Sequence, residues 1–236
     1  MVDKNKVMVF LALCCMGIMV IPFIASCGKS TTAPASANIQ MQVINLSPDL
    51  QPVDLYVNYI KQNTTSYSYP TPSGYFSLTR IDTPIQVRSY LASVSTTNLF
   101  SIDTVLKTNF KYTLFITGLR ANASVVPIFT IDTANNPTVG RGKIRFVNAS
   151  PGSSGLDITA NGTIAFINQK YKMVSKFIEI PPGNYDFKIM PTGTATVISD
   201  LANVVVQDGK VYTLYCHGIA NGADSVAFGS GILSNR

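Results

Sequence analysis

The stretch "NLSPDLQPVDLYVN" runs from Asn45 to Asn58 and has a second copy, "NASPGSSGLDITAN", from Asn148 to Asn161. The two align without a gap at an offset of 103 residues and share Asn, Ser, Pro, Asp and Asn at equivalent places. A second motif repeats in the same order, since "YTLFITGL" (112–119) returns as "YTLYCHGI" (212–219). Solenoid repeats recur every ~20–50 residues, so this much longer period indicates duplication of a whole domain.

The repeated stretch has the chemistry of a strand that ends, turns and starts again. Pro48 and Pro151 have no amide hydrogen to continue a β-ladder, so a strand ends before each of them. Asp54 and Asp157 follow, and a short carboxylate accepts backbone hydrogen bonds and stabilises a turn. We therefore predict a strand–turn–strand corner that occurs once in each copy of the domain.

Composition favours strands throughout the region that follows the N-terminus. Hydrophobic residues make up 46% of the chain and charged residues 13%, and branched or aromatic side chains suited to a pleated surface are plentiful. We predict an all-β fold of two tandem immunoglobulin-like antiparallel β-sandwich domains after a lipoprotein signal peptide, with a pair of closed barrels as the alternative. Asn161-Gly162 between two short apolar runs predicts a tight hairpin. The expected strands are 39–46, 53–59, 75–79, 85–91, 99–106, 111–119 and 124–131, then 142–149, 155–160, 163–167, 174–180, 185–190, 196–206, 211–219 and 224–229.

The N-terminus has the order of a secretory signal. Lys4 and Lys6 precede an uninterrupted apolar run from Val7 to Ile24, and small and polar residues follow it. The run is long enough that a retained transmembrane anchor is an alternative, and simple secretion is another.

The end of this segment, Ile24-Ala25-Ser26-Cys27, resembles the bacterial lipobox. The resemblance implies that Cys27 becomes the lipidated first residue and attaches the chain to a membrane through its acyl chains. Cys14 and Cys15 would leave with the signal, so Cys216 would be the only thiol of the folded part. The expected organisation is signal peptide (1–26), lipidated Cys27 with a flexible tether (27–38), β-sandwich repeat 1 (39–134), linker (135–141) and β-sandwich repeat 2 (142–236).

The first corner, "VINLSPDLQPVDLYVN", resembles the signature of a bacterial family known as domain of unknown function 4397, in two tandem copies. Ser47, Pro48, Asp49 and the strand 53–57 match its first part, and "IPPGNYDFKI" (180–189) matches its later hairpin. The resemblance implies the β-fold and an extracytoplasmic location. It implies no catalytic residues, because the family name assigns none.

The residues that could carry catalysis or bind a metal are scattered. His217 is the only histidine and lies beside Cys216, but neighbours on a strand point to opposite faces, so we expect ordinary structural positions rather than a metal site or a nucleophile–base pair. Asp49 and Asp54 could contribute to a calcium loop, yet turn chemistry is the favoured interpretation. The densest basic stretch is Arg141, Lys143 and Arg145, which we interpret as a solvated strand face or a guarded edge. The sequence therefore predicts no enzyme, no cofactor, no metal site and no nucleic-acid partner.

The loop "KQNTTSYSYPTPSGYF" (61–76) is the most suggestive binding feature. Tyr67, Tyr69 and Tyr75 cluster there with Asn63 and several hydroxyls, and such tyrosines can stack on sugars or anchor a protein partner. The alternative is an ordered loop that packs its tyrosines on the sandwich. The absence of Trp from the chain weakens the sugar interpretation.

Three Asp-Thr/Ser-aliphatic triplets resemble the O-glycan acceptor pattern of exported Bacteroidetes proteins. They centre on Thr104, Thr133 and Ser225. Thr133, between the repeats, is the candidate acceptor, since Thr104 and Ser225 are expected to be buried in strands.

The function expected from the sequence is a cell-envelope lipoprotein that acts as a non-catalytic binding or scaffolding module. The alternative is a glycan-binding lipoprotein of a polysaccharide uptake system. The expected partners are the membrane, through Cys27, and an unknown protein or glycan ligand. No acidic run follows Cys27, so an outer-membrane lipid anchor facing the periplasm is favoured over the cell surface.

Overall fold

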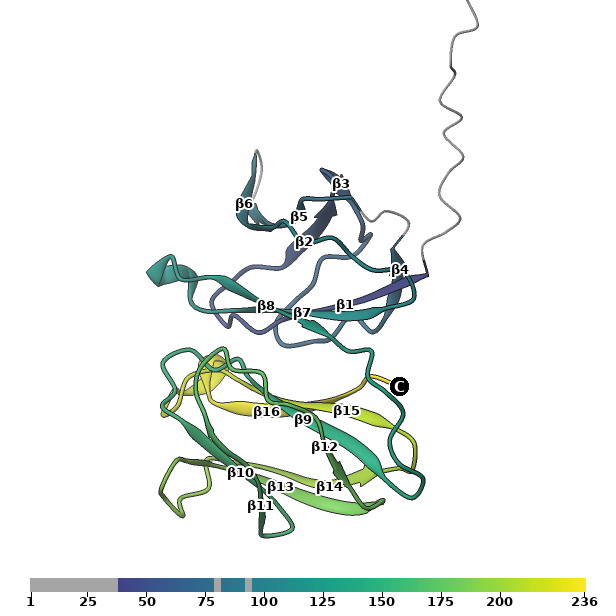
Figure 1. The fold of residues 1–236 in the computed structure, drawn as a ribbon. Helices are drawn as coiled ribbons and strands as arrows, with labels where there is room; N and C mark the ends of the chain where they lie inside the picture. The colour runs from purple at the N-terminus through teal and green to yellow at the C-terminus, as the bar shows by residue number, and fades with distance from the viewer. Residues whose placement is uncertain (1–37, 79–81, 92–94) are drawn as a thin grey trace, which may run out of the picture. The chain divides into compact units, whose positions relative to one another are not determined.

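The structure is a computed structural model that describes residues 38–78, 82–91 and 95–236 (Figure 1). The predicted signal peptide, Cys27 and the tether up to Ala37 lie outside these residues. Ser36–Arg236 form one compact unit. Within the described ranges, no helix has the length and apolar character needed to cross a membrane.

Repeat 1 consists of two four-stranded sheets, seen as two layers in Figure 1. Its strands are β1 (Ile39–Asn45), β2 (Val53–Val57), β3 (Ile60–Lys61), β4 (Phe76–Leu78), β5 (Ile85–Leu91), β6 (Ser95–Ile102), β7 (Lys111–Thr117) and β8 (Val126–Ile131). The order is β4-β1-β7-β8 in one sheet and β3-β2-β5-β6 in the other. A short 3₁₀ helix, η2 (Arg120–Asn122), connects β7 to β8.

Repeat 2 has the same strand order. Its strands are β9 (Gly142–Asn148), β10 (Leu156–Ala160), β11 (Thr163–Gln169), β12 (Ile178–Ile180), β13 (Gly183–Pro191), β14 (Ser199–Val206), β15 (Val211–His217) and β16 (Gly229–Ser234). They form the sheets β12-β9-β15-β16 and β11-β10-β13-β14. The 3₁₀ helix η3 (Asp224–Val226) connects β15 to β16.

The two predicted β-sandwiches are confirmed, and each encloses its own hydrophobic core. Val43, Leu55 and Leu114 are among the buried residues of the first core, and Phe146, Ile158 and Leu214 are among those of the second. One pair in each repeat runs parallel, β1 with β7 and β9 with β15, and the other pairs are antiparallel. The corner motif joins the two sheets of each sandwich, because β1 and β2, or β9 and β10, lie in different sheets.

Several expected strand boundaries were wrong, and three strands differ most. The strand expected at 99–106 is β6, which starts at Ser95 and ends at Ile102. The strand expected at 174–180 contains only β12, because residues 170–177 form a loop. The last strand, expected at 224–229, begins at Gly229, and 224–226 form η3 instead. In the first case, Val105 and Leu106 continue the apolar run past the last residue of β6. In the other two, the apolar residues Val174 and Val226 precede the first residue of the strand.

A third hydrophobic cluster joins the two repeats. It contains Ile44, Leu46, Phe115 and Ile128 from repeat 1 and Val147, Ala149, Tyr215 and Leu233 from repeat 2. Phe115 and Tyr215 occupy the same place in the duplicated motif, and their ring centroids lie 6.0 Å apart. Contact between equivalent residues is what a twofold relation between two copies produces. We call this region, with the polar contacts at its margin, the seam.

Arg145 lies in the seam and not on a solvated face. Its side chain is only 4% exposed and forms an ion pair with Asp132, which is also buried. Its guanidinium also donates to Thr213 Oγ1 of its own repeat and to the Ile131 carbonyl of repeat 1. The prediction of a solvated strand or guarded edge was wrong for Arg145, because β9 is buried on both faces. Lys143 does reach the surface, where it pairs with Glu179.

The predicted hairpin at Asn161-Gly162 is confirmed. Ala160 pairs with Thr163, and both turn residues have positive φ, as the favoured two-residue turn requires. Repeat 1 makes the same turn with Asn58 and Tyr59, at φ 47° and 64°. An exposed tyrosine therefore occupies the place that glycine fills in repeat 2.

Candidate functional site

Repeat 1 carries an open groove of about 620 Å³ on the surface of the segment 62–77. The groove lies within the loop that the sequence singled out. Its polar lining consists mainly of hydroxyls and amides, and Tyr67, Phe76 and Pro72 supply apolar surface. The polar residues are Gln62, Asn63, Thr64, Thr65, Ser66, Ser68, Thr71, Ser73 and Ser77.

Asp54 of β2 holds the first half of this loop, residues 61–66, in place. Its carboxylate accepts hydrogen bonds from Lys61 Nζ at 2.7 Å, Asn63 Nδ2 at 2.8 Å and Ser66 Oγ at 2.7 Å. Burial raises the pKa of Asp54, but the hydrogen bonds from Lys61, Ser66 and Asn63 outweigh it and hold the pKa below its ordinary value. The buried carboxylate is therefore ionised at neutral pH and holds residues 61–66 in one arrangement.

The second half of the loop is attached to β1. Val43 N donates to Ser73 Oγ at 2.9 Å, and Ser73 N donates to the Val43 carbonyl. Phe146 and Ser175 repeat both contacts in repeat 2. The two loops are thus attached to equivalent strands, β1 and β9, by the same pair of hydrogen bonds, and we call this shared attachment the frame.

The groove-forming half differs between the repeats. In repeat 1, eight residues run from Ile60, the first residue of β3, to Tyr67, which pairs with Val53. In repeat 2, seven residues run from Thr163, the first residue of β11, to Gln169, which pairs with Leu156. Repeat 2 extends its strand β11 to Gln169, whereas β3 ends at Lys61. Repeat 1 therefore has room for the irregular segment 62–66 that forms one side of the groove.

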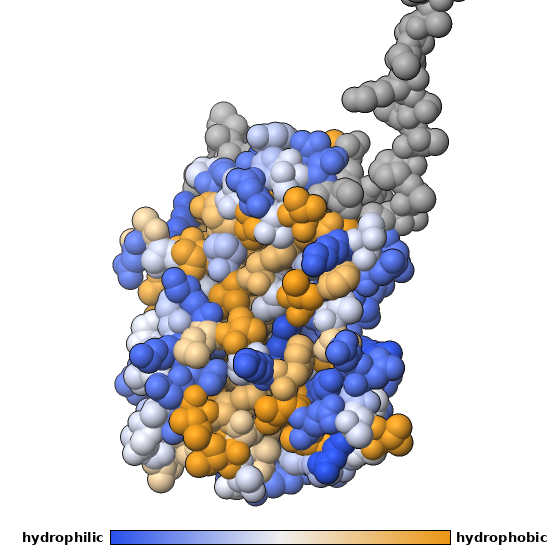
Figure 2. Space-filling model, in the orientation of Figure 1, coloured by the Kyte–Doolittle hydropathy of each residue, from blue (hydrophilic) through white to orange (hydrophobic). Residues whose placement is uncertain are grey.

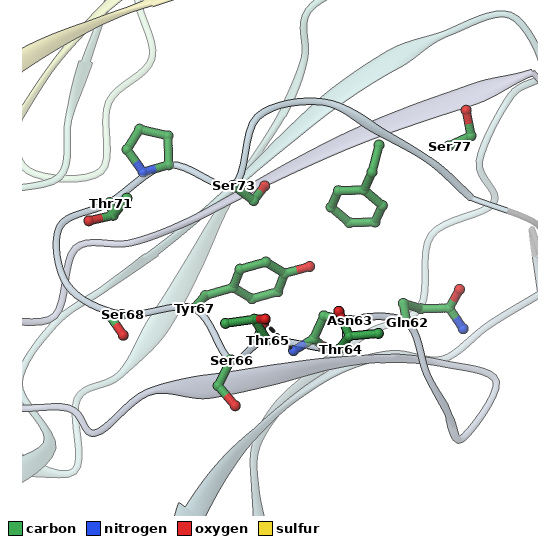
Figure 3. A pocket seen from close by; sticks show the side chains of 12 residues that line it. Gln62, Asn63, Thr64, Thr65, Ser66, Tyr67, Ser68, Thr71, Ser73 and Ser77 are labelled. Carbon is green, nitrogen blue, oxygen red and sulfur yellow. Dashed lines mark hydrogen bonds between the residues drawn. The ribbon is translucent and has the colours of Figure 1, made fainter.

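Tyr67 is the aromatic residue of the groove. Figure 3 shows its ring in the middle of the groove, with Ser73 on one side and Asn63 and Thr65 on the other. The ring packs against Phe76 at 6.4 Å between centroids. Burial, together with the Asp54 carboxylate, raises the pKa of Tyr67 to about 12, so its hydroxyl keeps its proton at neutral pH.

Several groove hydroxyls are available to a ligand. Within the part of the chain that the structure describes, no hydrogen bond is made by the side-chain hydroxyls of Thr64, Thr65, Tyr67, Ser68, Thr71 and Ser77. Most of these side chains are exposed. The groove therefore offers neutral donors and acceptors next to an aromatic face.

The structure separates the other residues proposed for binding from this groove. Tyr69 Oη lies 2.8 Å from His217 Nδ1 of repeat 2. Tyr75 Oη donates to Asp132 at 2.7 Å and accepts from Asn235 Nδ2 of repeat 2 at 2.9 Å. Both tyrosines thus bridge the seam, as the packing alternative expected. Asn63 lines the groove, but its amide attaches the loop to β2. Its Oδ1 accepts from Leu55 N, and its Nδ2 donates to Asp54 and to the Thr65 carbonyl.

The residues considered for catalysis or metal binding lie apart. Cys216 is buried in the core of repeat 2, where burial raises its pKa to about 12, whereas His217 faces Tyr69 at the seam. The expectation that these two neighbours point to opposite faces is confirmed. Asp49 accepts from the amides of Arg120 and Ala121 at the start of η2, which is turn chemistry. Among the described residues, no group of three or more His, Cys, Asp and Glu side chains is placed to hold a metal ion.

The three possible O-glycan acceptors lie outside strands. Thr133 is exposed, and its Oγ1 accepts a hydrogen bond from Lys111 N at 2.8 Å. The expectation that Thr104 and Ser225 are buried in strands was wrong: Thr104 follows the end of β6, and Ser225 is exposed in η3. Attachment of a glycan to Thr133 stays a prediction.

The lowered pKa of Asp54 predicts how the stability of the protein depends on pH. Because its folded-state pKa lies below the ordinary value of 3.8, its stabilising contribution is complete above that pH and is lost as the pH falls through the folded pKa. We expect Asp54→Asn to lower the free energy of unfolding at pH 7, and the difference from the wild type to shrink by pH 3. Urea unfolding at both pH values measures this difference. A difference that stays constant between pH 7 and pH 3 would contradict the assignment.

Asp157, the counterpart of Asp54, provides a control in the same chain. Its pKa is also lowered, mainly by the amide of Asn168, but its carboxylate has no lysine partner among the described ion pairs. We expect Asp157→Asn to reduce stability less than Asp54→Asn at pH 7, because Asp157 lies closer to solvent.

The surface in Figure 2 shows hydrophobic side chains in several separate groups among hydrophilic ones on the face drawn.

Comparison with known proteins gives a family match and a distant structural similarity. The family described as "Domain of unknown function (DUF4397)" matches residues 39–159 and 142–229. No curated protein matches the chain. A solved structure titled "The Bacillus anthracis TIE protein" is similar over 83% of this chain and 43% of that one, at 11% identity and a TM-score of 0.25. The chain thus spans less than half the length of that protein.

Proposed function

Given that this chain belongs to the DUF4397 family, whose description assigns no function, we propose that it is a non-catalytic binding module of the bacterial cell envelope. The groove of repeat 1 is its contact site for a ligand. The observation that carries this proposal is the set of unpaired hydroxyls around Tyr67, on a loop that Asp54 and Ser73 hold in place. A pre-ordered loop loses little conformational entropy when it binds.

A neutral glycan is the ligand class that the lining favours. Sugars present hydroxyl groups that pair with Ser, Thr and amide side chains, and their C–H faces pack on aromatic rings such as Tyr67. Of the groove-lining side chains, none carries a formal charge. A charged ligand would therefore lack a counter-ion in the groove, whereas a neutral one requires none.

Removing hydroxyls without changing shape tests the groove. We expect the combined variant Tyr67→Phe, Thr71→Val and Ser77→Ala to weaken binding of neutral oligosaccharides at least tenfold, since each lost hydrogen bond is worth about 0.5–1.5 kcal/mol. An array of neutral oligosaccharides identifies the one that the wild type retains, and calorimetry then gives its affinity for both proteins.

A matched control removes three hydroxyls from repeat 2. Ser154→Ala, Thr163→Val and Tyr185→Phe change exposed or partly exposed positions far from the groove in sequence. The control variant should bind like the wild type. Equal weakening in both variants, or full affinity in the groove variant, would exclude the groove as the contact site.

We propose that lipidated Cys27 attaches the module to the membrane, on the basis of the lipobox-like Ile24–Cys27. We expect radiolabelled palmitate to label the wild type and to leave Cys27→Ser unlabelled, with residues 1–26 still attached to the variant. Autoradiography and intact mass measure the two effects. If Cys27→Ser is processed and labelled like the wild type, the anchor lies elsewhere.

A further inference from the structure

The loop of repeat 2 that corresponds to the groove loop has a different surface. Met173 and Val174 occupy the places of Thr71 and Pro72, as shown by the matching bridges of Val174 to Val147 and of Pro72 to Ile44. Counting from the same frame, Lys170, Lys172 and Lys176 replace Ser68, Pro70 and Gly74. The duplicated frame therefore carries neutral hydroxyls in one repeat and a cationic, apolar loop in the other.

The lysines of this loop are exposed and carry uncompensated charge. Of the ion pairs in residues 38–78, 82–91 and 95–236, none includes Lys170, Lys172 or Lys176. The neighbouring carboxylate of Glu179 is already paired with Lys143. Three positive charges thus lie within seven residues of one loop.

Apolar side chains are exposed between these lysines. Met173 is 43% exposed and Val174 is 37% exposed. The backbone of the loop is bonded to β9 and leaves these side chains outward. Lys172 N donates to the Asn148 carbonyl, and Asn148 N donates to the Met173 carbonyl. Tyr171 faces inward instead, with its hydroxyl buried at the seam beside Thr117.

We propose that the loop Lys170–Lys176 docks on the surface of an anionic phospholipid bilayer. The lysines bind the headgroups, and Met173 and Val174 enter the boundary between headgroups and acyl chains. Clustered lysines next to exposed apolar side chains are the combination that interfacial membrane contacts use. A nucleic acid would use the lysines but would gain nothing from the exposed Met173 and Val174.

Vesicle sedimentation tests this docking with the compact unit Ser36–Arg236, which contains all three hydrophobic clusters and lacks the apolar run of the N-terminus. We expect it to bind vesicles of phosphatidylcholine mixed with phosphatidylglycerol, and not pure phosphatidylcholine. Binding should weaken as salt rises, because salt screens exposed charges. The variant Lys170→Gln, Lys172→Gln and Lys176→Gln should bind at least tenfold more weakly.

A charge-matched control separates the loop from the overall positive charge. Lys107→Gln, Lys188→Gln and Lys210→Gln remove the same charge from exposed positions elsewhere and should leave vesicle binding within about twofold of the wild type. Met173→Gln with Val174→Gln should weaken binding at unchanged charge. Near-ultraviolet circular dichroism checks that every variant keeps its fold.

Three results would overturn the proposal. The first is no binding of the wild type to phosphatidylglycerol vesicles. The second is an equal loss of vesicle binding in the loop lysine variant and in the control lysine variant, which would mean that the overall positive charge of the protein drives binding. The third is tighter binding of single-stranded DNA than of vesicles through the same three lysines. None of these results depends on the groove of repeat 1.

Discussion

Replacing Asp132 with Ala is expected to lower the free energy of unfolding by about 3–5 kcal/mol, because it leaves the buried Arg145 guanidinium without a counter-ion. Asp132 is 2% exposed and also accepts hydrogen bonds from Thr113 Oγ1 at 2.5 Å and Thr130 Oγ1 at 2.9 Å. Urea unfolding at pH 7, followed by far-ultraviolet circular dichroism, measures the loss.

The surface pair of Lys143 with Glu179 is the control for this prediction. Its atoms lie 3.5 Å apart and both side chains reach solvent, so Glu179→Ala should cost much less stability than Asp132→Ala. Combining Asp132→Ala with Arg145→Met should restore part of the loss, since no unpaired charge then stays buried. If Asp132→Ala costs no more than Glu179→Ala, the pair is not buried as described.

The second large effect is expected for Phe115→Ala. Phe115 is fully buried in the seam against Tyr215, and truncation of such a ring typically costs about 3–5 kcal/mol. Ile164→Ala is the control, because Ile164 is 60% exposed on β11 and its truncation should cost less than about 0.5 kcal/mol.

Amide hydrogen exchange in the Phe115→Ala variant tests whether the seam couples the two repeats. Because its ring packs on repeat 2, Phe115→Ala should speed amide hydrogen exchange in β15 as well as in β7. Faster exchange in repeat 1 alone would mean that the seam does not couple the two repeats.

The duplicated corner was sufficient to predict the two sandwiches. Pro48, Asp54 and their counterparts determine where strands end and restart, and this information is local. The hairpin at Asn161-Gly162 and the opposite directions of Cys216 and His217 also follow from local geometry. The parallel pairing of β1 with β7 does not, because it joins segments about 70 residues apart.

Arg145 shows why the seam was missed. An alternating basic residue on a strand has the same sequence pattern whether its face meets water or a second sheet. Asp132, its partner, lies after the end of β8, outside any periodic segment. Only the packing of one repeat on the other brings the two charges together.

The groove was partly predictable. The loop 61–76 was recognised from its tyrosines and hydroxyls, and Tyr67 does lie in the groove. Tyr69 and Tyr75 lie in the seam instead, since their partners in repeat 2, His217 and Asn235, come from distant segments. The structural role of Asn63 depends on the proximity of Asp54, which the sequence pattern does not reveal. The cluster of Lys170, Lys172 and Lys176 was not recognised from the sequence. It became apparent only when the structure showed which residues of the two loops are equivalent.

The binding of a neutral glycan in the groove is tested most directly by amide chemical shifts of nitrogen-labelled Ser36–Arg236. The titrant is the neutral oligosaccharide that the array retains most strongly. We expect saturable shifts at residues 62–77 and none at the corresponding segment 165–179 of repeat 2. Shifts confined to repeat 2 or to the seam, or an array that retains no neutral oligosaccharide, would contradict the account.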